Sequence, residues 1–381
     1  MGHNRATITH AYQVGEAAFQ VREYTRAHTS VGALSQESEA ALNQLAHEKK
    51  AYQTIDRSVL MAIHAGRQAV AEAGWTNQSD ITINLGSSRG ATGLFEQYLQ
   101  EFQQTGTVPP LASPVTTLGN ISSWLAQDLG VSGPTISHSV TCSTGLQAIA
   151  NGFAWLKSGM ADKFLAGASE APLTPFTIAQ MKAIGIYSAD IDNPYPCRPH
   201  NAERKNTFVL GEGAAVFALE KIAETDLTRE EVKPIIIESI GFGFETITSK
   251  TGISKEGLHF QLAIRDAIKK AAHTAPIDLV IMHAPGTVAG DSAELRALEA
   301  VFKETSMPII ASSKWLTGHT LGAAACLSLE YALHLLKSQS YLPFPYPTHL
   351  IPHSAKPIQR ILITAAGFGG NAAAIIVSRA V

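Results

Sequence analysis

The sequence predicts an α/β protein, because short apolar runs alternate along the chain with segments of helical periodicity. The runs lack the polar alternation of half-exposed strands, so we expect strands buried on both faces. They occupy residues 81–88, 164–171, 214–220, 234–243, 277–287, 308–313, 360–370 and 372–378. The helical segments lie at 56–73, 144–157, 259–272, 292–303 and 321–337. This alternation favours helical cover on both faces of the sheet.

Two of the predicted helices are similar. In the segment 144–157, apolar residues recur at i, i+3, i+4 and i+7. This helix ends in AWLKS and the helix at 321–337 ends in HLLKS, 180 positions later. Both are apolar on nearly all sides, so we expect both in the middle of the molecule. The echo suggests two similar halves, 1–230 and 231–381, joined near the polar stretch 225–234.

Composition narrows the function. The 381 residues are 45% hydrophobic, which is enough to bury a large core. The formal net charge is −3 and the chain has no run of Lys or Arg, which argues against a nucleic-acid partner. There is no signal-peptide core and no stretch of 18 apolar residues, so we expect a cytoplasmic protein without a membrane span.

The three cysteines, Cys142, Cys197 and Cys326, are odd in number and widely spaced. They predict neither a disulfide framework nor a metal site, and indicate a reducing compartment. Cys326 lies in an apolar helix, where a thiol packs as a small hydrophobe. Cys142 differs, because it follows an extended run and precedes a helix. The N-terminus of a helix stabilises a thiolate, so we expect a lowered pKa and a nucleophilic role.

Candidate partners for Cys142 follow other predicted strands. His283 and His319 each precede a glycine-containing turn, and Lys314 stands between an apolar run and Gly318. The loop 365–370 surrounds Phe368 with glycines and could direct backbone N–H groups at an oxyanion. Taken singly, each has a structural alternative: a buried histidine, a solvated lysine and an ordinary tight turn.

Five motifs together resemble one family, the elongating β-ketoacyl-acyl-carrier-protein synthases, over residues 50 to 381. They are TCSTG (141–145), VLGEGAA (209–215), HAPGT followed by AGD (283–291), SSKWLTGH followed by LGAA (312–324) and GFGG (367–370). The resemblance implies a thiolase-like fold with five αβαβα layers built from two similar halves. It also implies a dimer, homomeric or with a second ketosynthase-like subunit. An acyl carrier protein would deliver substrates on its phosphopantetheine arm, with no metal or other cofactor.

The resemblance also implies a role for each candidate. Cys142 matches the nucleophile that accepts the acyl chain, and His283 and His319 match the histidines that bind the malonyl thioester and promote loss of CO₂. Lys314 matches the active-site lysine. The backbone N–H groups of Cys142 and Phe368 match the oxyanion hole, and Phe368 matches the gate of the acyl pocket. The implied reaction is a decarboxylative Claisen condensation in fatty acid, polyene or polyketide biosynthesis, so the chain would be an acyltransferase.

The branch within the family follows from two positions. Initiating synthases resemble Cys-His-Asn sites, whereas His319 stands here in place of Asn. Thiolases place a second Cys in the last glycine loop, and AAGFGGN has none. Departures indicate a divergent, specialised member: ATITHAYQVG matches the usual first strand poorly, and Ser328 stands where the family usually has a Glu that supports the lysine, with Glu330 two residues on.

Three expectations concern surfaces and partners. Lys49, Lys50 and Arg57 fall in the region that aligns with the family's carrier-docking patch, although an ordinary solvated helix face is the alternative. Phe176, Met181, Ile184 and Ile186 are candidates for lining the acyl pocket, with core packing as the alternative. A non-catalytic chain-length-factor-type subunit is the alternative function. Such factors typically lack the nucleophile, and this chain keeps Cys142, His283 and His319.

Overall fold

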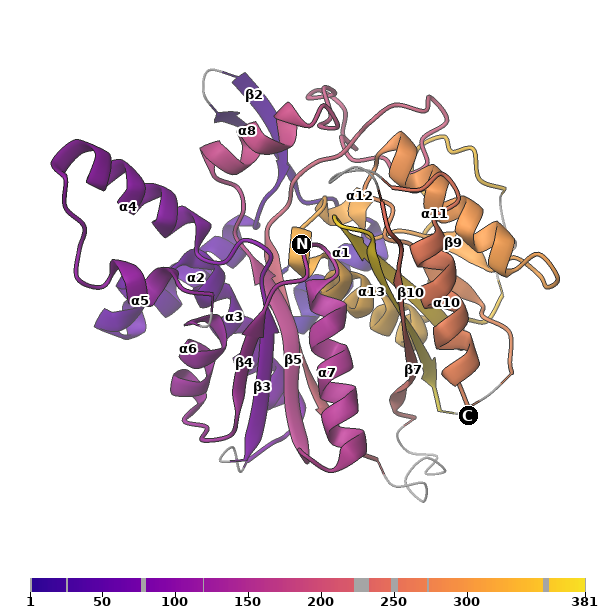
Figure 1. Cartoon of the computed structure of the whole chain (residues 1–381), viewed down its shortest axis with the longest axis horizontal. Coiled ribbons are helices and arrows are strands. Elements are labelled where there is room, and N and C mark those ends of the chain that lie inside the picture. Colours follow the sequence, from indigo (N-terminus) through magenta and orange to yellow (C-terminus); the bar gives the residue numbers. More distant parts are fainter. Residues whose placement is uncertain are drawn as a thin grey trace.

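The computed structural model describes the chain except for residues 1, 25–26, 77–79, 119, 223–232, 248–252, 273, 352–355 and 381. Figure 1 shows two large β-sheets with helices between them and further helices on their outer sides, and β1 (Phe19–Tyr24) and β2 (Ala27–Gly32) form a separate two-stranded sheet. The predicted α/β class and the five αβαβα layers are therefore confirmed. The predicted junction at 225–234 lies outside the described residues, apart from Lys233 and Pro234.

The first sheet has the strand order β4-β3-β5-β6. Its strands are β3 (Ile81–Gly86), β4 (Thr135–His138), β5 (Lys163–Glu170) and β6 (Gly213–Glu220). β3 runs parallel to both of its neighbours, and Ile83 pairs with Thr135 on one side and Leu165 on the other. β6 closes the sheet antiparallel to β5. Every residue of β3 is buried, as the continuous apolar run predicts.

The second sheet has the order β7-β11-β10-β8-β9. Its strands are β7 (Ile235–Phe244), β8 (Leu279–Ile281), β9 (Ile309–Ala311), β10 (Arg360–Gly367) and β11 (Asn371–Arg379). β8, β9 and β10 are parallel, whereas β11 is antiparallel to both β10 and β7. β8 and β9 are shorter than the predicted runs 277–287 and 308–313, because the chain turns away into loops that carry the candidate site residues.

The two sheets have equivalent topologies with one difference. Strands β4, β3, β5 and β6 correspond in order and direction to β9, β8, β10 and β11. β7 pairs along β11 in the second sheet, whereas the described residues contain no strand on the corresponding edge of β6. The first half is thus an incomplete repeat of the second.

The central layer contains α7 (Thr144–Ser158) and α13 (Ala324–Ser338), which contact each other between the sheets. The sequence predicted both helices and their central position. They join one hydrophobic cluster that also includes residues of β5, β10 and β11. The helices approach closely at Gly145, where an added Cβ would lie 2.5 Å from the Cys326 sulfur.

The outer layer of the first sheet contains α3 (Arg57–Glu72) and α6 (Asn120–Leu129). The outer layer of the second sheet contains α10 (Leu258–Lys270) and α11 (Val288–Val301). α11 begins four residues before the predicted 292, because Thr287 caps it through a bond from the Gly290 N–H.

Several elements were not predicted. They are α1 (Arg5–Val14), β1 (Phe19–Tyr24), β2 (Ala27–Gly32), α2 (Gln36–Glu48), the 3₁₀ turn η1 (Lys50–Thr54), α4 (Thr92–Thr105), α5 (Ala112–Thr116), α6, α8 (Pro175–Ala183) and α12 (Lys314–Thr317). Most are short or largely exposed, so their apolar periodicity is weak; α4 has no buried residue at all. The helix predicted at 321–337 begins with a 3₁₀ turn, η2 (Leu321–Ala323), before α13. Among the described residues, no helix is long and apolar enough to span a membrane.

Candidate active site

The candidate nucleophile lies in the short connection between β4 and α7. Thr141, directly before Cys142, has a positive φ of 51°, and its carbonyl accepts hydrogen bonds from the Thr144 N–H and hydroxyl. A β-branched residue rarely adopts this conformation, so the turn is strained and held by the bonds around it. The strained turn places Cys142 immediately before Ser143, the residue that precedes the first turn of α7.

The pKa of the Cys142 thiol is higher than the sequence predicts. Cys142 is partly accessible from a cavity, but burial, together with the Glu170 carboxylate, raises the pKa of its thiol to about 12. Lys314 and Arg89 oppose this shift without cancelling it. The predicted lowering by the helix N-terminus is therefore wrong for the free chain. The resting residue is a thiol that must lose a proton in order to react.

His283 follows β8 and is oriented through its backbone. Its N–H donates to the Glu294 carboxylate at 2.8 Å and to the Thr364 hydroxyl at 3.2 Å. Burial lowers the pKa of His283 well below its usual range, and Lys314 and His319 lower it further. The imidazole is therefore neutral at physiological pH.

His319 lies in the loop after α12, and a hydrogen bond defines the tautomer of its imidazole. Its Nδ1 lies 3.0 Å from the Leu321 N–H, which donates to it, so the ring proton is on Nε2. Burial lowers the pKa of His319 to about 3, and Lys314 contributes. The His319 N–H donates to Val209 O, and the Gly211 N–H donates to His319 O. Among the described residues the Nε2–H has no hydrogen-bond acceptor, so the neutral ring is suited to donating a hydrogen bond to a substrate oxygen.

Cys142, His283, His319 and Phe368 line the same cavity, which has a volume of about 350 Å³. The rings of His283 and His319 lie nearly perpendicular, with centroids 5.2 Å apart. The tertiary structure thus brings together residues from both halves of the chain.

Phe368 lies in the turn between β10 and β11, with 43% of its surface exposed. The turn abuts the nucleophile loop, because a Cβ on Gly367 would overlap the Thr141 hydroxyl. The Ser143 hydroxyl donates to the Asn371 side chain at 2.6 Å, and the Asn371 amide donates to Phe368 O. The positive φ of Gly369 and Gly370 explains the glycines in this turn.

Lys314 does not line the cavity, although it lies close enough to influence both histidines. It is 1% exposed, and burial lowers its pKa, while the Glu294 carboxylate opposes the shift. The predicted solvated alternative is therefore wrong. Ser328, at the position of the family's glutamate, shares a hydrogen bond with Ser313 instead.

Three buried acids near the site were missed in the sequence. Glu294 accepts from the N–H groups of His283 and Ala284, and burial raises its pKa. Asp291 accepts from the Gly286 and Thr287 N–H groups, and burial raises its pKa to about 7. The two acids lie three residues apart on α11, shortly after His283, and this helical spacing is a signal that could have identified them. Glu170 accepts from Ser88 and the Gly322 N–H, and nothing in its apolar strand singled it out.

Three of the four candidate pocket residues line the cavity, and one does not. Met181, Ile184 and Ile186 line the cavity as expected. Phe176 does not, and 61% of its surface is exposed, so its predicted pocket role is wrong.

Two of the three candidate docking cations form ion pairs with acidic residues of the same chain. Arg57 forms ion pairs with Glu39 at 2.5 Å and Glu212 at 2.8 Å, and Lys49 contacts Asp128 at 3.4 Å. Lys50 is exposed at the start of η1. None of the three lines the cavity that contains Cys142.

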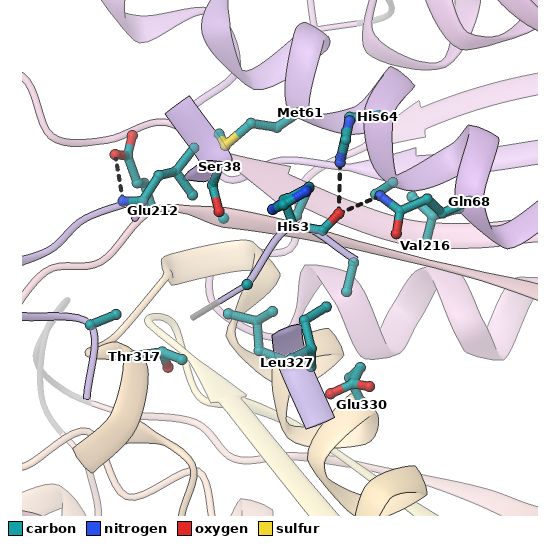
Figure 2. Close-up of a pocket in the computed structure, with 18 of the residues that line it drawn as sticks. His3, Ser38, Met61, His64, Gln68, Glu212, Val216, Thr317, Leu327 and Glu330 are labelled. Carbon is teal, nitrogen blue, oxygen red and sulfur yellow. Dashed lines mark hydrogen bonds between the residues drawn. The ribbon is translucent and has the colours of Figure 1, made fainter. Parts of the chain in front are cut away.

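Another cavity, of about 190 Å³, extends along the open edge of β6. Figure 2 shows His3 at its centre, where the His3 carbonyl accepts from His64 at 2.9 Å and Gln68 at 2.7 Å. None of the candidate catalytic residues lines it. Within the described ranges, no group of three or more His, Cys, Asp or Glu side chains could hold a metal ion.

Comparison with known proteins identifies relatives over most of the chain. Residues 11–225 match the model "Beta-ketoacyl synthase, N-terminal domain", and residues 236–345 match "Beta-ketoacyl synthase, C-terminal domain". A 3-oxoacyl-[acyl-carrier-protein] synthase 2 of Vibrio cholerae is 30% identical over 353 residues, covering 87% of this chain and 84% of the relative. A putative polyketide beta-ketoacyl synthase 1 of Streptomyces cyaneus is 28% identical over 369 residues, covering 90% and 86%.

Solved structures agree on the fold. The ishigamide ketosynthase/chain length factor superposes with a TM-score of 0.84 at 21% identity, covering 98% of this chain and 95% of that one. A beta-ketoacyl synthase from Burkholderia phymatum superposes with a TM-score of 0.82 at 22% identity, with the same coverage.

Proposed function

The chain belongs to the beta-ketoacyl synthase family, and from this premise we propose that it condenses carrier-bound thioesters through an acyl-enzyme on Cys142. One observation carries the proposal: Cys142, His283 and His319 line a single cavity, and the Nε2–H of His319 is available to a ligand. Family membership supports an acyltransferase, and the relatives' names support carrier-bound substrates. The proposed reaction uses the carrier's phosphopantetheine arm and needs no metal or other organic cofactor.

The first step is acyl transfer. Cys142 loses its proton and attacks the thioester carbonyl, so that an acyl–sulfur bond forms and the carrier leaves as a free thiol that takes up a proton. The carbonyl oxygen becomes negative in the tetrahedral intermediate. The backbone N–H groups of Cys142 and Phe368 are the proposed donors to it, and such donors typically contribute about 10²–10³ in rate each.

The second step is decarboxylative condensation. The malonyl C–C bond breaks, CO₂ leaves, and the electron pair remains on the α-carbon as an enolate. Two neutral histidines donating N–H bonds to the thioester oxygen stabilise this charge. The enolate carbon then attacks the acyl-Cys142 carbonyl and releases Cys142. The charge of Lys314 lowers the pKa of both histidines and so favours their neutral form.

The proposed acyl-enzyme is tested by intact-protein mass spectrometry after mixing the chain with an acyl-carrier thioester. One acyl adduct on the wild type, absent from Cys142→Ala, is the expected result. A folded wild type that gains no adduct, alone or with a second ketosynthase-like subunit, would overturn the proposal.

A second candidate is a non-catalytic partner of the chain-length-factor type. Its support is that the ishigamide neighbour and another similar structure contain a ketosynthase with a chain length factor. The active half of a heterodimer is an intermediate case. Purified chain that forms a homodimer and becomes acylated favours an independent enzyme. Acylation only after addition of a partner subunit favours the heterodimer.

A subunit contact is part of the proposal. Phe95, Leu99 and Phe102 recur along one face of α4, each with about half or more of its surface exposed. Exposed apolar patches of this kind mark protein interfaces. The double variant Phe95→Glu/Phe102→Glu should therefore shift the chain from dimer to monomer in sedimentation velocity, and an unchanged dimer would exclude this face.

The carrier-docking expectation narrows to Lys50, supported by Lys49, because Arg57 is held in ion pairs. Lys50→Glu should raise KM for a carrier-bound substrate several-fold and leave alkylation of Cys142 unchanged. Lys303→Glu, at another exposed site, is the matched control. An unchanged KM would exclude Lys50.

The proposal also includes a division of the chain into two halves at residue 230. It further includes a reducing, cytoplasmic location, and the free state of all three cysteines is compatible with such a compartment.

A further inference from the structure

The cavity wall contains a buried acid–imidazole pair with no role in the steps above. His259 Nδ1 lies 2.6 Å from Glu245 Oε1, and the two side chains are only 3% and 4% exposed. Both residues line the cavity that contains Cys142, His283 and Phe368.

The pair results from a close contact between α10 and β7. An added Cβ on Gly243 would overlap the His259 carbonyl, so the absence of a side chain lets the first turn of α10 lie directly on the strand. This contact brings His259 beside Glu245, two residues after Gly243. The ring of His259 also packs on Phe260 in a tilted arrangement, with centroids 4.4 Å apart, and the ring centroid of Phe260 lies 6.4 Å from that of His283.

Glu245 is connected to the glycine loop that carries Phe368. The Glu245 N–H donates to Gly370 O at 2.9 Å, and Phe244 pairs with Asn371 in the sheet. A Cβ on Gly370 would overlap the Glu245 carbonyl, so the loop lies directly against the backbone of Glu245. The turn 367–370 is thus held between the nucleophile loop at Thr141 on one side and Glu245 on the other.

Among the described residues, few groups compensate the side chain of Glu245. Apart from His259, the described contacts of its carboxylate consist of the Ser254 N–H, 3.3 Å from Oε1. Burying a carboxylate is costly unless it is paired, and loss of one partner leaves an uncompensated buried charge. Among the described side chains, His259 is thus the main neighbour of the Glu245 carboxylate, and the backbone of Glu245 in turn contacts Gly370.

We propose that Glu245 and His259 are positioning residues, which hold the Gly367–Asn371 loop so that the Phe368 N–H is directed at the acyl oxygen during formation of the acyl-enzyme. The inference rests on the proposed function, because it concerns the same site. It predicts that the pair acts on acyl transfer, which develops an oxyanion, and leaves simple alkylation of the Cys142 sulfur unaffected.

The test compares two reactions of Cys142 in the full-length chain. One is the rate of acylation by a carrier-bound acyl thioester, followed by mass spectrometry. The other is the rate of alkylation by iodoacetamide, which forms no oxyanion. The variants are His259→Phe, which keeps an aromatic ring but loses the contact with Glu245, and Glu245→Gln, which keeps the shape of the acid. Glu238→Gln is the matched control, since it alters a buried pair with Arg360 nearer the start of β7.

We expect His259→Phe to slow acylation by about 10- to 100-fold. This is less than or equal to the rate loss of about 10²–10³ that complete removal of one oxyanion donor causes. Glu245→Gln should lie between this variant and the wild type. Alkylation should stay within twofold in both, KM for the thioester should not change, and Glu238→Gln should acylate at the wild-type rate.

Three outcomes overturn the inference. Equal acylation rates in wild type and His259→Phe show that the loop does not need the pair. Parallel loss of acylation and alkylation shows a general structural role. A change confined to KM shows that the pair contacts the substrate instead. A wild type that does not acylate at all refutes the proposed function rather than the positioning role.

Discussion

His283 and His319 meet with their ring centroids 5.2 Å apart and their planes at 85°, although they follow different strands of the second sheet. Each is buried and neutral, and each has its backbone tied to a separate part of the fold: His283 to Glu294 and His319 to Val209. The two rings can therefore present N–H groups to one ligand without carrying charge themselves.

His319→Gln should separate the two half-reactions. Glutamine retains an N–H donor but cannot keep both the Leu321 contact and the position of Nε2. We expect condensation with a malonyl thioester to fall by about 10²–10³, and acylation of Cys142 to remain within tenfold of wild type. Separate single-turnover assays measure the two steps. Equal losses in both would contradict the assignment of His319 to the malonyl step.

The thiol of Cys142 should behave as a high-pKa nucleophile in the free chain. With a pKa of about 12, its thiolate fraction rises about tenfold for each pH unit through the neutral range. The rate of inactivation by iodoacetamide should therefore increase continuously from pH 6 to pH 9. A plateau below pH 8 would show a stabilised thiolate, as the helix N-terminus alone predicts.

Glu294→Gln should destabilise the protein by about 2–3 kcal/mol, because the amide cannot accept from both the His283 and Ala284 N–H groups. One buried backbone donor then loses its partner. Denaturant unfolding measures the change, and Glu299→Gln, an exposed position on the same helix, is the control. A change below about 0.5 kcal/mol in Glu294→Gln would exclude this role.

His200 should reduce stability in mild acid. Burial lowers its pKa to about 3, with His349 contributing, whereas in the unfolded chain it titrates near 6.5. The unfolded state therefore binds more protons below pH 6.5, and stability falls as the pH decreases toward 3. At pH 5.5 the loss is about 1.4 kcal/mol.

His200→Asn should lack this part of the pH dependence, and asparagine tolerates the positive φ of 58° at this position. The free energy of unfolding is measured at pH 7.5 and 5.5 for both proteins. The same slope in wild type and variant would refute the linkage.

Gly145→Ala should destabilise the contact between α7 and α13 by about 1–3 kcal/mol, because the new methyl group would lie 2.5 Å from the Cys326 sulfur and 3.0 Å from Gly322 O. Cys326→Ala removes the sulfur and should recover part of the loss in the double variant. A double-mutant cycle by denaturant unfolding measures the coupling. Additive effects would mean that the helices move apart freely.

The helices, strands and site residues could be predicted from the sequence in some parts of the chain but not in others. The strand predicted at 164–171 appears as Lys163–Glu170, and the helix predicted at 144–157 as Thr144–Ser158, because both are long, apolar and buried. The helix α1 was not predicted, since Thr7, Ile8 and Thr9 are poor helix formers and only Ala11 and Tyr12 of this helix are buried. The candidate site was approached through motifs that each occupy one loop, and Glu170, Glu245 and His259 have no such motif.

The sequence by itself determined the α/β class, the two central helices and the identity of Cys142, His283, His319 and Phe368 as candidates. These features depend on local periodicity and on residue types at fixed spacing, which the chain carries without its fold. The tertiary structure alone decided the protonation of the site, the burial of Lys314 and the pairing of Glu245 with His259. A pKa depends on desolvation and on charges from distant segments, and only the folded chain brings these groups together.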